Sequence, residues 1–157
     1  MKRIALLRHG EAEYGKGQSG DFDRKLTSSG KYRVERLALV LAERKFSFDL
    51  ILQSPAVRTQ ETAEIISTAI EIKKKLEEKD YYLAEKDAWL EKINDLPEEF
   101  DSALVVGHNP GLSTLLDYYV GDYFLNLSPG MLAIVEIEVD SWKAITAGSG
   151  VLAEVIQ

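Results

Sequence analysis

The sequence contains no cysteine, which excludes disulfide cross-links, thiolate metal sites and phosphatase chemistry that uses a cysteine nucleophile. It also lacks a long apolar run near its start, where Met1, Lys2 and Arg3 are followed by only four apolar residues, Ile4 to Leu7. That run is too short for the core of a signal peptide or for a membrane span. We therefore expect no membrane association and a cytoplasmic location.

Basic residues are outnumbered, with 19 Lys and Arg against 26 Asp and Glu and a net charge of −7. Such a surface disfavours nucleic acids and anionic membranes as partners. Because salt screens charges beyond about 8 Å, a local group of arginines could still bind an anion inside a pocket. The sequence has no repeat and no linker rich in proline, glycine or serine, so we expect one domain spanning residues 1–157.

Patterns typical of strands alternate with patterns typical of helices. Strands are expected at 4–7, 49–53, 103–106, 131–139 and 150–156. Thr27 or Ser28 is expected to cap the first helix. Ser54 and Asn109 are expected to cap two others, with Pro55 and Pro110 as their first helical residues, and Trp89 lies in a further short helix. The apolar face of the first helix comprises Val34, Leu37, Ala38, Leu41 and Ala42. We interpret the charged run from Lys73 to Asp80 as a solvated helix face or loop. The alternation predicts a three-layer α/β/α sandwich with a mostly parallel central sheet.

The chain has only two histidines, and each closely follows a predicted strand. His9 follows the first strand and His108 follows the strand at 103–106. In open α/β sheets, ligands bind outside the carboxyl ends of the strands. Both histidines are therefore expected to face one pocket.

Arginines accompany these histidines. Arg8 precedes His9, and Arg58 lies in the first turn after Ser54-Pro55. Guanidinium groups stay charged and match phosphate oxygens, and the N-termini of helices also favour anions. Two guanidinium groups and two imidazoles around one pocket predict a site for a phosphoryl group. There is no Walker-type glycine loop and no tight cluster of metal ligands in the sequence, so we expect no nucleoside triphosphate, metal or other cofactor.

Four ordered segments carry a resemblance to a known family. The segment Leu7-Arg8-His9-Gly10-Glu11 resembles the Arg-His-Gly signature of the histidine phosphatase superfamily, which includes phosphoglycerate mutase-like enzymes. The other three follow in the family's order and spacing: Leu26-Thr27-x-x-Gly30, Ser54-Pro55-x-x-Arg58-Thr59-x-x-Thr62-Ala63 and Val106-Gly107-His108-Asn109-Pro110. The short length, Asp21-Phe22-Asp23-Arg24 and Ala147-Gly148-Ser149-Gly150 are most similar to the SixA branch, described as phosphohistidine phosphatases.

The resemblance implies a phosphoglycerate mutase-like fold and a role for each matching residue. It implies that His9 attacks phosphorus and becomes phosphohistidine, while Arg8, Arg58 and His108 hold the phosphoryl oxygens. It also implies that Gly10 and Arg24 bind phosphate or substrate. The attacking nitrogen must be neutral, and neighbouring arginines should lower the pKa of His9 and help to keep it so. A hydrogen bond from the other ring nitrogen to a backbone carbonyl would fix the tautomer.

The group that protonates the leaving atom is not fixed by the motifs. Asp80 and Glu85 lie in the segment where mutase-like relatives place a carboxylate, and Asp21 is a third possible proton donor. An alkoxide leaving group needs a proton, whereas an imidazole can be protonated before its bond to phosphorus breaks. A site with a weak or absent acid therefore favours a phosphohistidine-bearing protein, such as a signalling protein, as substrate.

Two alternatives stay open. One is a phosphatase of a small phosphorylated metabolite, which a working acid at Asp80 or Glu85 would favour. The other is a non-catalytic phosphate-binding module, against which the intact set of pocket residues argues. A mutase is disfavoured because the chain lacks insertions that would close over a bound phosphoglycerate.

Overall fold

The computed structural model describes residues 1–15, 20–121 and 124–157. In chain order, their elements are β1 (Lys2–Arg8), α1 (Ser28–Glu43), β2 (Ser47–Gln53), α2 (Val57–Ala69), β3 (Glu71–Glu77), the 3-10 helix η1 (Lys79–Tyr81), α3 (Lys86–Asn94), β4 (Ser102–Gly107), α4 (Gly111–Val120), β5 (Leu132–Ile137), the 3-10 helix η2 (Trp142–Ala144) and β6 (Gly150–Ile156). No helix within these ranges is long and apolar enough to cross a membrane.

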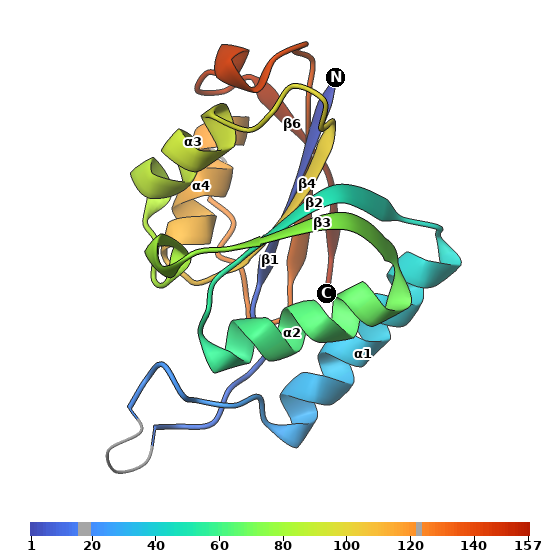
Figure 1. Ribbon diagram of the computed structural model, residues 1–157, viewed down its shortest axis with the longest axis vertical. Coiled ribbons are helices and arrows are strands. Elements are labelled where there is room, and N and C mark those ends of the chain that lie inside the picture. The colour runs from blue at the N-terminus through green and yellow to red at the C-terminus, as the bar shows by residue number, and fades with distance from the viewer. Residues whose placement is uncertain (16–19, 122–123) are drawn as a thin grey trace.

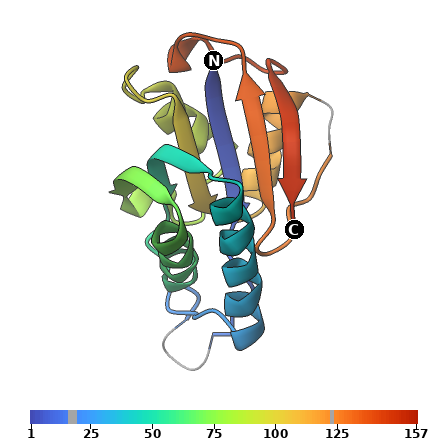
Figure 2. The same cartoon turned by 90° about the vertical axis from the view of Figure 1, so that its right-hand side faces the viewer.

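The six strands in the described part of the chain form one sheet in the order β3-β2-β4-β1-β5-β6. Neighbours from β3 to β1 are parallel, whereas β5 is antiparallel to both β1 and β6. Figure 2 shows the chain beginning on the central strand β1 and ending on the edge strand β6. The predicted α/β architecture with a mostly parallel sheet is confirmed.

Helices cover both faces of the sheet, with α1 and α2 on one side and α3 and α4 on the other (Figure 1). Side chains of β1 alternate between two apolar clusters. Ala5 and Leu7 pack in the cluster that includes residues of α1 and α2, while Ile4 and Leu6 pack in the cluster that includes α3 and α4. A strand buried on both faces needs an apolar residue at every position, which explains the uninterrupted run from Ile4 to Leu7.

The charged run from Lys73 to Asp80 is not the solvated helix face or loop that we expected. Its first part belongs to β3, which pairs in parallel with β2 at the edge of the sheet. Lys73, Lys74 and Lys75 are exposed there. An edge strand tolerates charged side chains because they discourage pairing with another chain. The charged residues of this run therefore belong to an exposed edge strand.

The helices follow the prediction only in part. Thr27 caps α1 as expected, since its hydroxyl accepts a hydrogen bond from the Gly30 amide at 2.9 Å. However, α2 and α4 begin at Val57 and Gly111, later than Ser54-Pro55 and Asn109-Pro110 suggested. Ala42 was wrongly placed on the buried face of α1 because it lies exposed near the helix end.

The sheet register brings the two histidines to the same edge. Arg8 of β1 pairs with Gly107 of β4, so His9 and His108 follow neighbouring strands at the same level. On the other side of β4, Gln53 of β2 lies opposite Val106, and the α2 helix starts shortly after it. The carboxyl ends of β1, β4 and β2 therefore deliver both histidines and the first turn of α2 to one place.

Candidate active site

His9 leaves the carboxyl end of β1 and is 7% exposed. Its ring Nδ1 lies 2.7 Å from the Gly10 carbonyl oxygen. A carbonyl oxygen can only accept, so Nδ1 carries the hydrogen and Nε2 keeps its lone pair. The backbone next to His9 thus sets the tautomer in which Nε2 carries a lone pair.

The turn after His9 is held by α2. The Gly10 amide donates to the Thr62 hydroxyl oxygen at 3.0 Å, and that hydroxyl donates to the Arg58 carbonyl at 2.8 Å. A Cβ at position 10 would lie 2.9 Å from a methyl carbon of Val34 and 3.2 Å from the Gly30 carbonyl oxygen. Gly10 is therefore required by close packing against α1, and its carbonyl is fixed where His9 needs it.

Arg58 lies in the first turn of α2, and its guanidinium joins the two histidines. Its Nε is 3.4 Å from His9 Nε2, and its Nη2 is 3.2 Å from His108 Nδ1. The side chain is only 2% exposed. A guanidinium with no acceptor atoms can bind here only to groups with lone pairs, so both facing ring nitrogens act as acceptors.

His108 has the opposite tautomer to His9. Because Arg58 donates to its Nδ1, the hydrogen is on Nε2, which donates to the Ser54 hydroxyl oxygen at 2.7 Å. The two imidazole rings are 5.4 Å apart between centroids, and His108 is 2% exposed. Ser54 follows β2, so three neighbouring strand ends contribute to this arrangement.

Arg8 and Arg24 lie at the margin of the site. Arg8 Nη1 donates to the Leu127 carbonyl at 3.0 Å, and its buried Nε has no hydrogen-bond partner among the described residues. Arg24 donates from Nε to the Glu13 carbonyl at 2.5 Å and from Nη1 to Asp21 at 3.0 Å. Neither guanidinium touches the His9 ring in the described contacts, but both charges act on its pKa.

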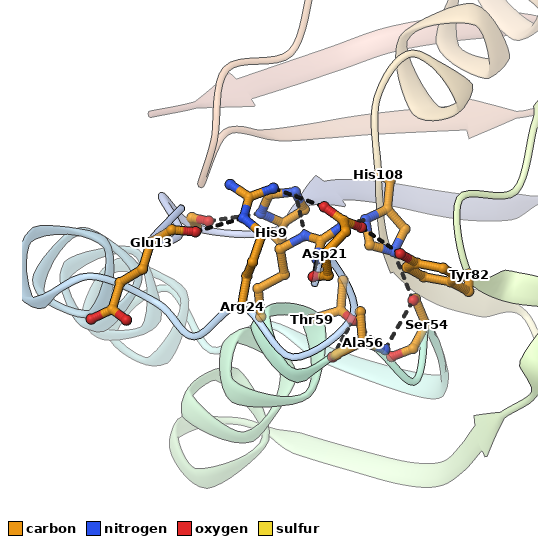
Figure 3. Close-up of polar contacts among 11 residues, drawn as sticks. His9, Glu13, Asp21, Arg24, Ser54, Ala56, Thr59, Tyr82 and His108 are labelled. Carbon is orange, nitrogen blue, oxygen red and sulfur yellow. Dashed lines mark hydrogen bonds and ion pairs between the residues drawn. The ribbon is translucent and has the colours of Figure 1, made fainter. Parts of the chain in front are cut away.

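Asp21 is brought to the mouth of the site by the loop that follows β1 (Figure 3). Arg58 donates from Nη2 to the Asp21 carboxylate at 2.9 Å and from Nη1 to the Asp21 backbone carbonyl at 2.7 Å. Arg24 donates to the second carboxylate oxygen at 3.0 Å, and the Tyr82 hydroxyl donates to the same oxygen as Arg58. Three donors from three segments therefore hold one partly exposed carboxylate.

The other two predicted proton donors do not join this group. Asp80 in η1 and Glu85 just before α3 are exposed. Within the described ranges, no hydrogen bond or ion pair connects either carboxylate to His9, His108 or Arg58.

Three side chains of the site were not identified from the sequence as site residues. Ser54 appeared only as a helix cap and Thr62 only as part of a motif, while Tyr82, two residues after the charged run, was not singled out. The Tyr82 ring packs edge-on against His108 at 5.5 Å and against Phe22 at 5.1 Å between centroids. The sequence around Tyr82 gave no sign of this contact, because it depends on how the segment after β3 folds back over the strand ends.

Burial and nearby cations keep both imidazoles neutral. Burial is the largest cause that lowers the pKa of His9, to about 4, and the charges of Arg58, Arg8 and Arg24 act in the same direction against the hydrogen bond with Gly10. Burial and then the Arg58 charge lower the pKa of His108 to about 3. Neutral imidazoles surrounded by guanidinium groups can bind a phosphoryl dianion and attack it.

Asp21 has the opposite character. Partial burial works to raise the pKa of its carboxyl, but hydrogen bonds from Tyr82, Arg24 and Arg58 outweigh it and hold that pKa well below its usual range. Burial, followed by the hydrogen bond to Asp21, raises the pKa of Tyr82. Around neutral pH the site therefore holds an ionised Asp21 and a protonated Tyr82. No group of three or more His, Asp or Glu side chains that could hold a metal ion occurs in the described part of the chain.

Comparison with known proteins identifies the family. The model of the histidine phosphatase superfamily (branch 1) matches residues 4–115. An uncharacterised protein of Picosynechococcus sp. (strain ATCC 27264 / PCC 7002 / PR-6) is 33% identical over 114 residues, which cover 69% of this chain and 67% of that protein.

Solved structures agree over nearly the whole chain. A protein from Agrobacterium tumefaciens assigned as the phosphohistidine phosphatase SixA superposes with a TM-score of 0.83 and 26% identity, covering 99% of this chain and 98% of that chain. The protein histidine phosphatase SixA solved with tungstate shares the fold, with a TM-score of 0.83 and 20% identity over 98% of this chain and 96% of that chain. This chain belongs to the histidine phosphatase superfamily and is a phosphatase with a SixA-type fold.

Proposed function

We propose that this phosphatase removes the phosphoryl group from phosphohistidine in a protein, through a phosphohistidine intermediate on its own His9. The observation that carries the proposal is the pairing of a neutral His9 Nε2 with Asp21, the one predicted proton donor that contacts the site in the described part of the chain, whose carboxyl pKa is lowered. The two SixA proteins named above, described as histidine phosphatases, support the same substrate class.

The first chemical step forms a bond between His9 Nε2 and phosphorus. The Nε2 lone pair faces Arg58 and so points to where the phosphoryl group would lie. The bond from phosphorus to the donor imidazole breaks, and its electrons stay on that imidazole. In the second step, water attacks the phosphorus on His9, inorganic phosphate leaves, and the electron pair returns to Nε2.

Cationic groups would hold the phosphoryl oxygens. Arg58 would exchange its contacts with Asp21 for phosphoryl oxygens, Arg8 has an unused donor at Nε, and Arg24 lies beside Arg58 on the same Asp21 carboxylate. The Gly10 amide already donates to Thr62, so Gly10 would shape the site without binding an oxygen. His108 would donate from Nδ1 after changing tautomer. Ser54 makes that change possible because its hydroxyl can donate to Nε2 as readily as it accepts.

The negative charge of Asp21 argues against a carboxyl group of the enzyme that would protonate an alkoxide leaving group. Asp21, the only one of the three predicted donors that contacts the site, is ionised around neutral pH and has no proton to give. Asp80 and Glu85 are exposed and make no contact with the histidines in the described contacts. A donor whose leaving group carries its own proton suits this site better than a phosphomonoester.

The test is to trap the intermediate. A protein phosphorylated on histidine with radioactive phosphate is mixed with the enzyme and quenched in alkali, where phosphohistidine is stable. We expect label on the native chain, no label on the His9→Ala variant, and full label on the Arg36→Ala variant, whose side chain lies exposed on α1.

Turnover then assigns the substrate class. The values of kcat/KM are compared for the phosphohistidine protein and for a panel of phosphomonoesters. Faster turnover of an ordinary sugar phosphate would overturn the substrate assignment, and phosphate binding without any label on His9 would indicate a binding module instead.

A further inference from the structure

The carboxylate of Asp21 presents a puzzle, because a permanent anion lies beside a pocket built for another anion. Its oxygens are 2.9 Å from Arg58 Nη2 and 3.0 Å from Arg24 Nη1, and the Tyr82 hydroxyl donates to it. It is ionised around neutral pH and would repel a phosphoryl dianion. We therefore expect a step in which an interaction with the negative charge of Asp21 stabilises the reaction and offsets this repulsion.

In-line geometry indicates where that interaction occurs. The leaving group lies opposite the nucleophile across phosphorus. His9, Arg58 and His108 are buried, with exposed fractions of 7%, 2% and 2%, so they form the floor of the site. Asp21 is 43% exposed and Phe22 39% exposed, so they lie on the solvent side. A donor attacked from the floor therefore has its leaving group among Asp21, Phe22 and Tyr82.

We propose that Asp21, held by Tyr82 and Arg24, forms a leaving-group subsite that selects phosphoryl groups bonded to a cationic nitrogen, above all a phosphorylated imidazole. This inference rests on the proposed function and specifies its leaving-group chemistry. Asp21 accepts a hydrogen bond from the ring nitrogen of the donor that is not bonded to phosphorus. An oxygen leaving group, which develops negative charge, meets the same carboxylate unfavourably.

The proton balance of this step is complete without an acid from the enzyme. The donor ring is an imidazolium whose distal nitrogen carries hydrogen. When the bond to phosphorus breaks, the electron pair goes to the proximal nitrogen, and the ring leaves as neutral imidazole with its distal hydrogen still directed at Asp21. Tyr82 keeps its own proton, and its raised pKa accords with that role.

Two aromatic rings complete the subsite. Phe22 and Tyr82 meet edge to face at 5.1 Å, and Tyr82 meets His108 in the same manner at 5.5 Å. These rings form a wall beside the carboxylate against which a flat imidazolium can pack. Figure 3 shows Asp21 and Tyr82 together beside the histidines.

The contact between Asp21 and Arg58 is the one that a bound phosphoryl group would replace. Arriving phosphoryl oxygens replace the carboxylate on Arg58, while Tyr82 and Arg24 retain it at the mouth. Asp21 therefore covers the buried guanidinium in the free enzyme and faces the leaving group in the complex.

The experiment compares two donors in an isosteric variant. Phosphoimidazole carries a cationic ring that leaves as neutral imidazole, whereas p-nitrophenyl phosphate loses an anionic phenolate, and kcat/KM reports the step in which each leaves. We expect Asp21→Asn to lower kcat/KM for phosphoimidazole by roughly 10- to 100-fold, the range for losing a charged hydrogen bond. For p-nitrophenyl phosphate, kcat/KM should stay level or rise. Tyr82→Phe should shift the ratio of the two values in the same direction by a smaller factor.

A matched control lies two residues away. Asp23 is exposed in the same loop, and Asp23→Asn removes the same charge from the surface. It should leave kcat/KM for both donors unchanged. An equal fall for both donors in Asp21→Asn would show that Asp21 only positions Arg58, and no fall for either would also overturn the subsite. Failure of the proposed function would look different, because the native chain would then form no phosphoenzyme on His9 from any donor.

Discussion

Acidification below pH 7 should destabilise this protein through its two histidines. The chain has only His9 and His108, both buried, with pKa values lowered to about 4 and about 3. In the unfolded chain, histidine has a pKa of about 6.5. Between these pKa values the histidines are protonated in the unfolded state but not in the folded state. The free energy of unfolding therefore falls as the pH drops below about 6.5.

The size of the effect follows from the same pKa values. Moving from pH 7 to pH 5 costs about 2 kcal/mol for each histidine, or roughly 4 kcal/mol together. That is a large part of the usual stability of a domain, about 5–15 kcal/mol. The free energy of unfolding is measured by urea titration at pH 7, 6 and 5, using the fluorescence of the buried Trp89 and Trp142.

Variants assign the effect to the histidines. His9→Gln should retain about half of the pH dependence, and the double variant His9→Gln/His108→Gln should retain almost none. If the double variant lost as much stability between pH 7 and pH 5 as the native chain, the histidines would not be neutral in the fold. The neutral nucleophile on which the proposed mechanism depends would then lose its support.

Three further substitutions test local features. Gly30→Ala should lower the free energy of unfolding by about 1–3 kcal/mol or more, because its Cβ would lie 2.2 Å from the Glu11 carbonyl oxygen; an unchanged urea midpoint would contradict this packing. Ser54→Ala removes the partner of His108 Nε2 and should cost about 1–3 kcal/mol by the same titration, together with a lower kcat/KM; full activity would show that the tautomer change does not need Ser54. Tyr119→Phe should leave the melting temperature level or raise it, because the buried hydroxyl has no partner in the described part of the chain, and a clear loss would reveal one.

Much of the fold could be predicted from local pattern. The apolar run from Ile4 to Leu7 identified β1, because a strand buried on both faces requires apolar residues at successive positions. Thr27 identified the start of α1, because the free amides at a helix N-terminus favour a hydroxyl or carboxylate side chain there. The edge strand β3 was missed because its side chains are mostly exposed, so its sequence shows no run of apolar residues. The starts of α2 and α4 were placed early because a capping residue followed by proline also suits a turn.

The site shows the same division. By itself, the sequence determined that a histidine follows each of two strands and that arginines accompany them, since these are matters of order along the chain. The tertiary structure alone decided that Tyr82 reaches His108, that Asp21 meets Arg58, and that these neighbours lower the pKa of the Asp21 carboxyl. The reason is that pKa and contact depend on burial and on donors from distant segments, and these come together only when the parallel strands align their carboxyl ends.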